Sequence, residues 1–207
     1  KLKIRRIYDM IPSNLESKKK RVVFQDIEDK RGKRFSDYQD EFEYLISAGI
    51  ALDVNAITTP VFPLTQSVGK NLLKLYLNDV GLLTDVLYGS NIRAILDDET
   101  GINLGSVYES VVAQELAAHG YKLFYYDNRS KGEVDYLIDD YDSLSAIPIE
   151  VKSGKDYTVH SALSTFIKND DYHVKKAFVL SNTREITTNG KITYLPIYDV
   201  MFLQNNS

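Results

Sequence analysis

The chain has 207 residues, 43% of them hydrophobic, which is enough for packed cores and exceeds the usual size of one small domain. It carries 25 Lys and Arg residues against 29 Asp and Glu residues, and the absence of Cys excludes disulfides and thiolate zinc sites. No apolar run reaches membrane-spanning length and no signal-peptide pattern is present, so we expect a cytoplasmic protein with no membrane partner.

The first part of the sequence predicts a small, mainly helical domain. The expected elements are helices over residues 3–11, 13–20 and 36–48, strands over 50–58 and 72–80, and a short helix over 81–88. Pro12 separates the first two helices. Helices followed by a hairpin predict a winged-helix-like domain over residues 1–99. The helix over 36–48 is acidic, which argues against reading a DNA groove and favours contact with protein.

Basic residues are concentrated at the start of the chain. Residues 1–34 carry 12 Lys or Arg against 5 Asp or Glu, whereas residues 35–207 carry 13 against 24. Two basic clusters, Lys18–Arg21 and Lys30–Arg34, could bind phosphates. A solvated surface or contact with another domain explains them equally well.

An α/β domain is predicted over residues 100–207, with its boundary near Thr100. Its expected elements are helices over 104–119 and 161–168 and strands over 121–126, 133–138, 146–152, 174–180 and 191–195. This order predicts a mixed sheet flanked by helices.

The helix over 104–119 supplies one candidate carboxylate. Its predicted apolar arc consists of Leu104, Val107, Tyr108, Val111 and Val112. Glu109 lies at the edge of this arc, where an acid can reach the end of a sheet while one side stays wet. Glu115 falls near the middle of the apolar face, so either it is buried and paired or the helix is rotated from this interpretation.

Two neighbouring strands supply the other candidates. Side chains alternate along a strand, so Asp135 is expected opposite to Val134 and Tyr136. By the same rule, Glu150 and Lys152 point away from the apolar side of their strand. An exposed Glu-x-Lys pair is often only a solvated surface. Here the short connection favours an antiparallel pair, in which two carboxylates and an ammonium converge and can hold a divalent cation and a water.

These residues resemble the PD-(D/E)XK nuclease superfamily. Its signature is an Asp on one strand, matched by Asp135, and a Glu-x-Lys on the next, matched by Glu150 and Lys152, after a helix that bears a Glu. The resemblance implies a restriction-endonuclease-like fold with Glu109, Asp135, Glu150 and Lys152 as catalytic residues. It also implies Mg²⁺ or Mn²⁺ held by Glu109, Asp135 and Glu150.

A wider resemblance covers nearly the whole chain, and its most specific segments are Lys74–Leu83 and Glu150–Gly154. The chain is similar to a C-terminal module of unknown function that follows an AAA-type ATPase domain in bacterial and archaeal ATP-binding proteins. An ATPase domain in the same full-length protein is the partner that this resemblance implies. The sequence itself has no phosphate loop, because Gly69-Lys70 is followed by Asn71. We therefore expect no ATP site here and a chain that is part of a longer protein.

Three functions remain open from the sequence. The first is a magnesium-dependent nuclease that cleaves nucleic acid, for which all the expected residue types are present. The second is a non-catalytic module that binds nucleic acid or protein and regulates the ATPase, favoured by the acidic balance of residues 35–207. The third is a structural α/β domain used for oligomer or partner contacts. Catalysis of any kind is thus an open question at this point.

Overall fold

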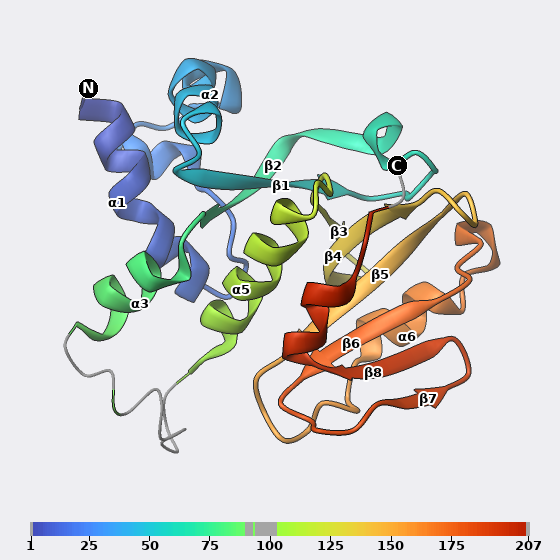
Figure 1. The fold of residues 1–207 in the computed structure, drawn as a ribbon. Coiled ribbons are helices and arrows are strands. Elements are labelled where there is room, and N and C mark those ends of the chain that lie inside the picture. Colours follow the sequence, from blue (N-terminus) through green and yellow to red (C-terminus); the bar gives the residue numbers. More distant parts are fainter. Residues whose placement is uncertain (1, 90–92, 94–102, 206–207) are drawn as a thin grey trace. The chain divides into compact units, whose positions relative to one another are not determined.

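The computed structural model describes residues 2–89, 93 and 103–205. The chain forms two compact units (Figure 1). Unit 1 consists of residues 1–54 and 70–102, and unit 2 of residues 55–69 and 103–207. The predicted boundary near Thr100 lies outside the described residues. No described helix is both long and apolar enough to cross a lipid bilayer.

Unit 1 is built mainly from helices. These are α1 (Leu2–Glu16), α2 (Gln39–Ser47) and α3 (Val80–Tyr88). Two strands, β1 (Ala51–Ile57) and β2 (Val68–Leu77), are neighbours and continue from one unit into the other. The more specific winged-helix fold stays a prediction.

The expected break at Pro12 is wrong, because α1 runs through this residue as one helix. Pro12 is buried together with Ile7, Ile11 and Leu15 on one face of α1. Burial of this apolar face offsets the one backbone hydrogen bond that proline cannot donate. The helix therefore ends at Glu16, before the first basic cluster.

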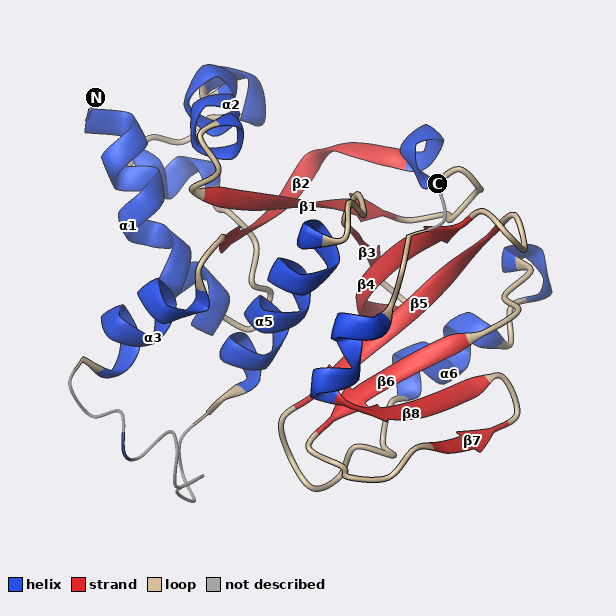
Figure 2. Cartoon of the chain, in the orientation of Figure 1, coloured by secondary structure: helices blue, strands red, loops and turns tan. Residues whose placement is uncertain are grey.

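Unit 2 contains a mixed sheet (Figure 2). Its further strands are β3 (Phe124–Asn128), β4 (Gly132–Asp140), β5 (Ser145–Lys152), β6 (Ala177–Ser181), β7 (Thr187–Asn189) and β8 (Ile192–Pro196). The strand order is β1-β3-β4-β5-β6-β8-β7. Strands β3, β4 and β5 pair antiparallel, β6 pairs parallel with both β5 and β8, and β1 pairs parallel with β3 through residues 55–57. A mixed sheet with helices is thereby confirmed.

Helices cover both faces of this sheet. Leu163 and Phe166 of α6 (Ser161–Ile167) pack with Ala146 and Val179 in a buried apolar core. The core also includes Ile57 and Leu64, which precede the rest of unit 2 in the sequence. Helix α5 (Gly105–Ala118) and a 3-10 helix (Ile197–Phe202) cover the other face. Strand β5 is consequently buried from Ser145 to Val151, so the side of the strand that carries Glu150 is covered as well as the apolar side.

Strand β4 departs from simple alternation. The register against β3 shifts between Phe124 and Tyr126, which marks a bulge in the pairing. Val134 and Leu137 enter the same apolar core, three residues apart, whereas the Tyr136 hydroxyl donates a hydrogen bond to a backbone carbonyl of α5. The expected placement of Val134 and Tyr136 on one face is therefore wrong. The bulge adds one residue to β4 between Val134 and Leu137, and this extra residue reverses the alternation of side chains.

Gly132 begins β4 at a point where only glycine fits. Its φ of +92° lies in the left-handed region, and an added Cβ would meet the Cβ of Ala162 at 2.9 Å. Gly132→Ala should therefore lower the free energy of unfolding by about 2 kcal/mol, from backbone strain and the clash together. Urea unfolding of the full chain measures this change.

Gly154→Ala is the matched control, because an added Cβ there meets no atom within 4 Å. In a double-mutant cycle with Ala162→Gly, the coupling energy between positions 132 and 162 should equal only the part caused by the clash. An equal loss of stability in Gly132→Ala and Gly154→Ala would contradict the conclusion that only glycine fits at position 132.

Candidate functional site

Glu150 and Lys152 form the centre of the candidate site. They lie two residues apart at the end of β5, and the Nζ of Lys152 is 2.8 Å from the Oε1 of Glu150. Glu150 is buried, with 7% of its surface exposed, and the side chain of Lys152 is 29% exposed. A carboxylate in such a place needs a cationic neighbour, because burial alone disfavours its charge.

Burial and neighbouring charges together shift the pKa values of this pair. Burial raises the pKa of Glu150, Lys152 opposes this, and the nearby charge of Glu109 raises it further. Burial on its own would lower the pKa of Lys152, but Glu150, followed by Asp135 and Glu109, raises it above the ordinary value. The ammonium of Lys152 therefore stays protonated at neutral pH.

Asp135 approaches from the neighbouring strand. Its Oδ2 accepts a hydrogen bond from the backbone N–H of Val151, with 2.8 Å between the two atoms. The pairing of Tyr136 with Ile149 makes Asp135 and Glu150 neighbours across the two strands. Asp135 thus lies beside the Glu-x-Lys segment, and its charge acts on Lys152.

Glu109 comes from α5 and is itself buried, with 4% exposed. The Tyr136 hydroxyl donates a hydrogen bond of 2.8 Å to the Glu109 backbone carbonyl. This hydrogen bond links α5 to β4. Glu109 acts electrostatically on both Glu150 and Lys152. The four residues that the sequence singled out therefore belong to one electrostatic neighbourhood.

Helix α5 is rotated relative to the predicted apolar arc. Its buried face contains Ser106, Val107, Glu109, Ser110, Val112, Ala113 and Leu116. Tyr108 and Val111 are only partly buried, and Glu115 is partly exposed rather than central to the buried face. Of the two explanations for Glu115, rotation of the helix is the one observed. Small residues such as Ser110 and Ala113 let the helix backbone approach the sheet closely.

The donor atoms suit a hard divalent cation in type. Carboxylate oxygens are the ligands that Mg²⁺ prefers, and the Oε2 of Glu150 is buried with no hydrogen-bond partner. Within the part of the chain that the structure describes, however, no three His, Cys, Asp or Glu side chains converge closely enough to hold an ion. The residue types at the site fit a metal ion, but the carboxylates of Glu109, Asp135 and Glu150 do not converge closely enough to hold one.

His160 and Tyr194 were not identified from the sequence as site residues. His160 precedes α6 and is buried, with its Nε2 2.8 Å from the Tyr194 hydroxyl and its Nδ1 3.1 Å from the Ser164 Oγ. His160 acts electrostatically on Glu150 and lowers the pKa of this carboxyl, against the dominant effect of burial. Tyr194 is 34 residues away in the sequence, so no local pattern could reveal this pair.

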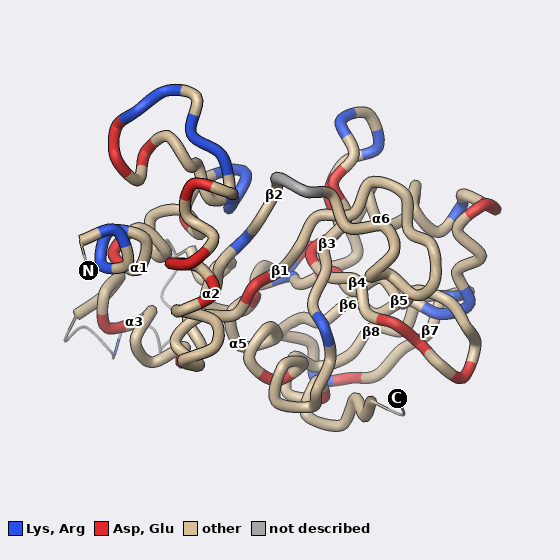
Figure 3. Tube along the Cα trace, turned by 90° about the horizontal axis from the view of Figure 1, so that it is seen from above, with Lys and Arg blue, Asp and Glu red and all other residues tan. Residues whose placement is uncertain are grey.

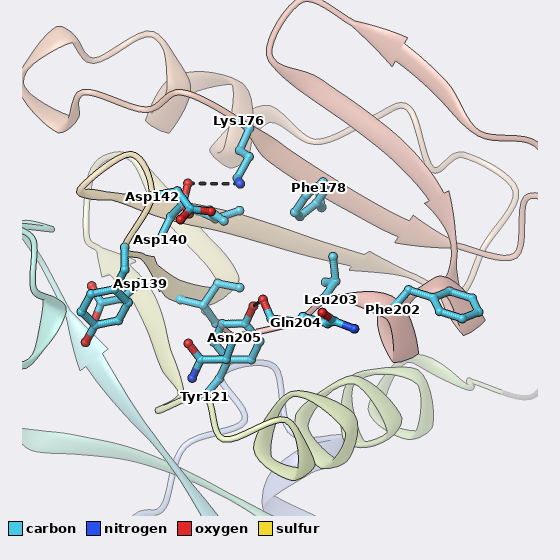
Figure 4. A pocket seen from close by; sticks show the side chains of 13 residues that line it. Tyr121, Asp139, Asp140, Asp142, Lys176, Phe178, Phe202, Leu203, Gln204 and Asn205 are labelled. Carbon is cyan, nitrogen blue, oxygen red and sulfur yellow. Dashed lines mark hydrogen bonds and ion pairs between the residues drawn. The ribbon is translucent and has the colours of Figure 1, made fainter. Parts of the chain in front are cut away.

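A separate cavity of about 280 Å³ lies on the α5 side of the sheet (Figure 4). Ile138, Ile147 and Phe178 line it together with the C-terminal segment. At its edge the Nζ of Lys176 is 3.1 Å from the Oδ2 of Asp140. Glu109, Asp135, Glu150 and Lys152 do not line this cavity.

A protein-family model matches the part of the chain that contains the candidate residues. Residues 104–200 match the family model of DUF4143, a domain of unknown function. The DUF4143 segment includes α5 and strands β3 to β8, and with them all four candidate residues. No curated protein and no solved structure matches the chain. The match supports a domain of unknown function over residues 104–200, while its place after an AAA-type ATPase domain and its likeness to nucleases stay predictions.

Proposed function

We propose that this chain carries a metal-dependent nuclease-like centre, in a restriction-endonuclease-like fold, that hydrolyses phosphodiester bonds of nucleic acid. The observation that carries the proposal is the buried Oε2 of Glu150, which lacks a hydrogen-bond partner beside the ammonium of Lys152. Asp135 and Glu109 add negative charge from two further elements. An excess of buried carboxylates over cations is the charge pattern that a divalent ion neutralises.

Each residue has a distinct role in this proposal. Glu109, Asp135 and Glu150 would hold Mg²⁺ or Mn²⁺ through carboxylate oxygens. The bound ion would stabilise charge on the phosphate and lower the pKa of a water. Lys152 is protonated at neutral pH, because its carboxylate neighbours raise its pKa. It would orient the water and stabilise the phosphate charge through its ammonium group.

The alternative is a non-catalytic module that binds nucleic acid or protein. One specific observation favours it: Lys152 already supplies a cation to Glu150 at 2.8 Å, as a structural ion pair would. In either case, we propose that the chain acts beside an AAA-type ATPase domain of the same full-length protein and that unit 1 is winged-helix-like. The first part rests on the resemblance carried by Lys74–Leu83 and Glu150–Gly154, and the second on the order of helices followed by a hairpin.

A cleavage assay tests the proposal directly. The full chain is incubated with single-stranded and double-stranded DNA and RNA, with Mg²⁺, with Mn²⁺, and with EDTA. We expect cleavage of at least one substrate with metal and none with EDTA, because the carboxylates alone cannot neutralise the phosphate charge. Inactivity on all four substrates with both metals, also after fusion to the ATPase domain, would favour the non-catalytic module.

A further inference from the structure

The basic segment of unit 1 forms a hollow with a defined shape. Residues 17–34 carry eight Lys or Arg residues against three Asp or Glu residues, whose positions along the trace are coloured in Figure 3. Part of this segment borders an open hollow of about 400 Å³. Lys19, Arg21 and Lys33 line it, and the Nζ of Lys33 lies 3.7 Å from the Oε2 of Glu28 and 3.9 Å from the Oδ1 of Asp37.

The wall of this hollow is apolar. Val23, Phe24 and Leu72 line it, and Val23 and Leu72 are 40% and 36% exposed. The ring of Phe24 is held edge-on by Phe35 and Phe42, at centroid distances of 6.2 and 6.0 Å. Phe24 therefore keeps its position without a ligand, and the apolar wall is already formed.

Backbone hydrogen bonds fix the segment on both sides of the hollow. Val22 donates to the Leu73 carbonyl of β2 at 2.9 Å, and Lys30 donates to the Gln25 carbonyl at 3.0 Å. A turn that ends at Lys20 is closed by a hydrogen bond to the Ser17 carbonyl. The basic side chains thus project from an anchored backbone, which lowers the entropy lost when they bind a ligand.

We propose that this hollow binds one nucleotide unit of single-stranded nucleic acid. The base would lie against Val23, Phe24 and Leu72, while Lys19 and Arg21 would contact the flanking phosphates. A paired base in a duplex cannot enter such a hollow, whereas an unpaired base can. Binding here is independent of cleavage in unit 2, because it needs no divalent ion.

The test is titration of the full chain with a labelled oligo(dT) of about 12 nucleotides, in EDTA, between about 50 and 200 mM salt. Lys19→Ala/Arg21→Ala should weaken binding about tenfold at low salt. It should also lower the magnitude of the slope of log K against log salt by about 1.4, since each lost phosphate contact contributes about 0.7. Val23→Ser should weaken binding and leave the slope unchanged.

Lys30→Ala/Arg31→Ala is the matched control, because it removes the same charge from the same segment outside the hollow. This control should retain most of the affinity and the slope, and a duplex of the same length should bind more weakly. Equal losses in the two double variants would overturn the proposal. So would binding of polyglutamate in place of oligo(dT), because the surface would then accept acidic proteins.

Discussion

Asp135→Asn and Glu150→Gln should each reduce metal-dependent cleavage by about 100-fold or more. Each change removes the charge of one carboxylate and keeps the shape of its side chain. Lys152→Ala should slow cleavage but leave metal affinity largely intact, because an ammonium cannot ligate a cation. Calorimetric metal binding and initial cleavage rates, measured on the same three variants, separate these two effects.

Glu185→Gln provides the control for charge alone, because Glu185 is exposed and distant in sequence from the candidate residues. It should keep wild-type rate and metal affinity. Unfolding curves must show that the inactive variants stay folded. Cleavage that survives in Asp135→Asn and in Glu150→Gln would exclude these carboxylates as the metal site.

Lys152→Met should lower the free energy of unfolding by about 2 kcal/mol at neutral pH, because it leaves the buried carboxylate of Glu150 without its cation. The pKa of Glu150, already raised by burial, should rise further. The folded variant then binds a proton that the unfolded chain releases, so its stability should increase from about pH 8 to about pH 5. Urea unfolding across this range measures the effect.

A double-mutant cycle tests whether the unpaired charge of Glu150 causes the loss of stability in Lys152→Met. Glu150→Gln/Lys152→Met removes both charges and should lie within about 1 kcal/mol of the wild type, with little dependence on pH. Lys176→Met is a matched control, because Asp140 keeps a hydrogen bond from Ser143 at 2.6 Å after its ion pair is lost. It should be less destabilising than Lys152→Met. A double variant as unstable as Lys152→Met would show that packing of the lysine stem matters more than charge.

Elements with strong local patterns could be predicted from the sequence. Strand β5 follows from the alternation of Ile147, Ile149 and Val151 with other residues. Helix α5 lies within one residue of its expected ends at Leu104 and His119. Strand β7 was missed, because Thr187–Asn189 is exposed throughout and has no apolar pattern. It exists as a strand only through its pairing with β8.

Tertiary packing decided the features that the sequence could not reveal. Helix α5 is apolar around much of its circumference, so its wheel could not identify which side meets the sheet. The bulge in β4 depends on pairing with β3, and no residue type in β4 predicts it. Asp135, Glu150 and Lys152 were found because their motif lies on consecutive strands. His160 and Tyr194 come together only in three dimensions.

The early segment within unit 2 has a consequence for how this protein can be divided. Residues 55–69 supply Ile57 and Leu64 to the core of unit 2, and the Leu64 N–H donates to the Asp139 Oδ1 at 3.0 Å. A recombinant piece confined to the DUF4143 match would lack all of them and would leave β3 with an unpaired edge. Such an edge invites intermolecular strand pairing and aggregation. Expression boundaries should therefore follow the three-dimensional unit, with β1 included.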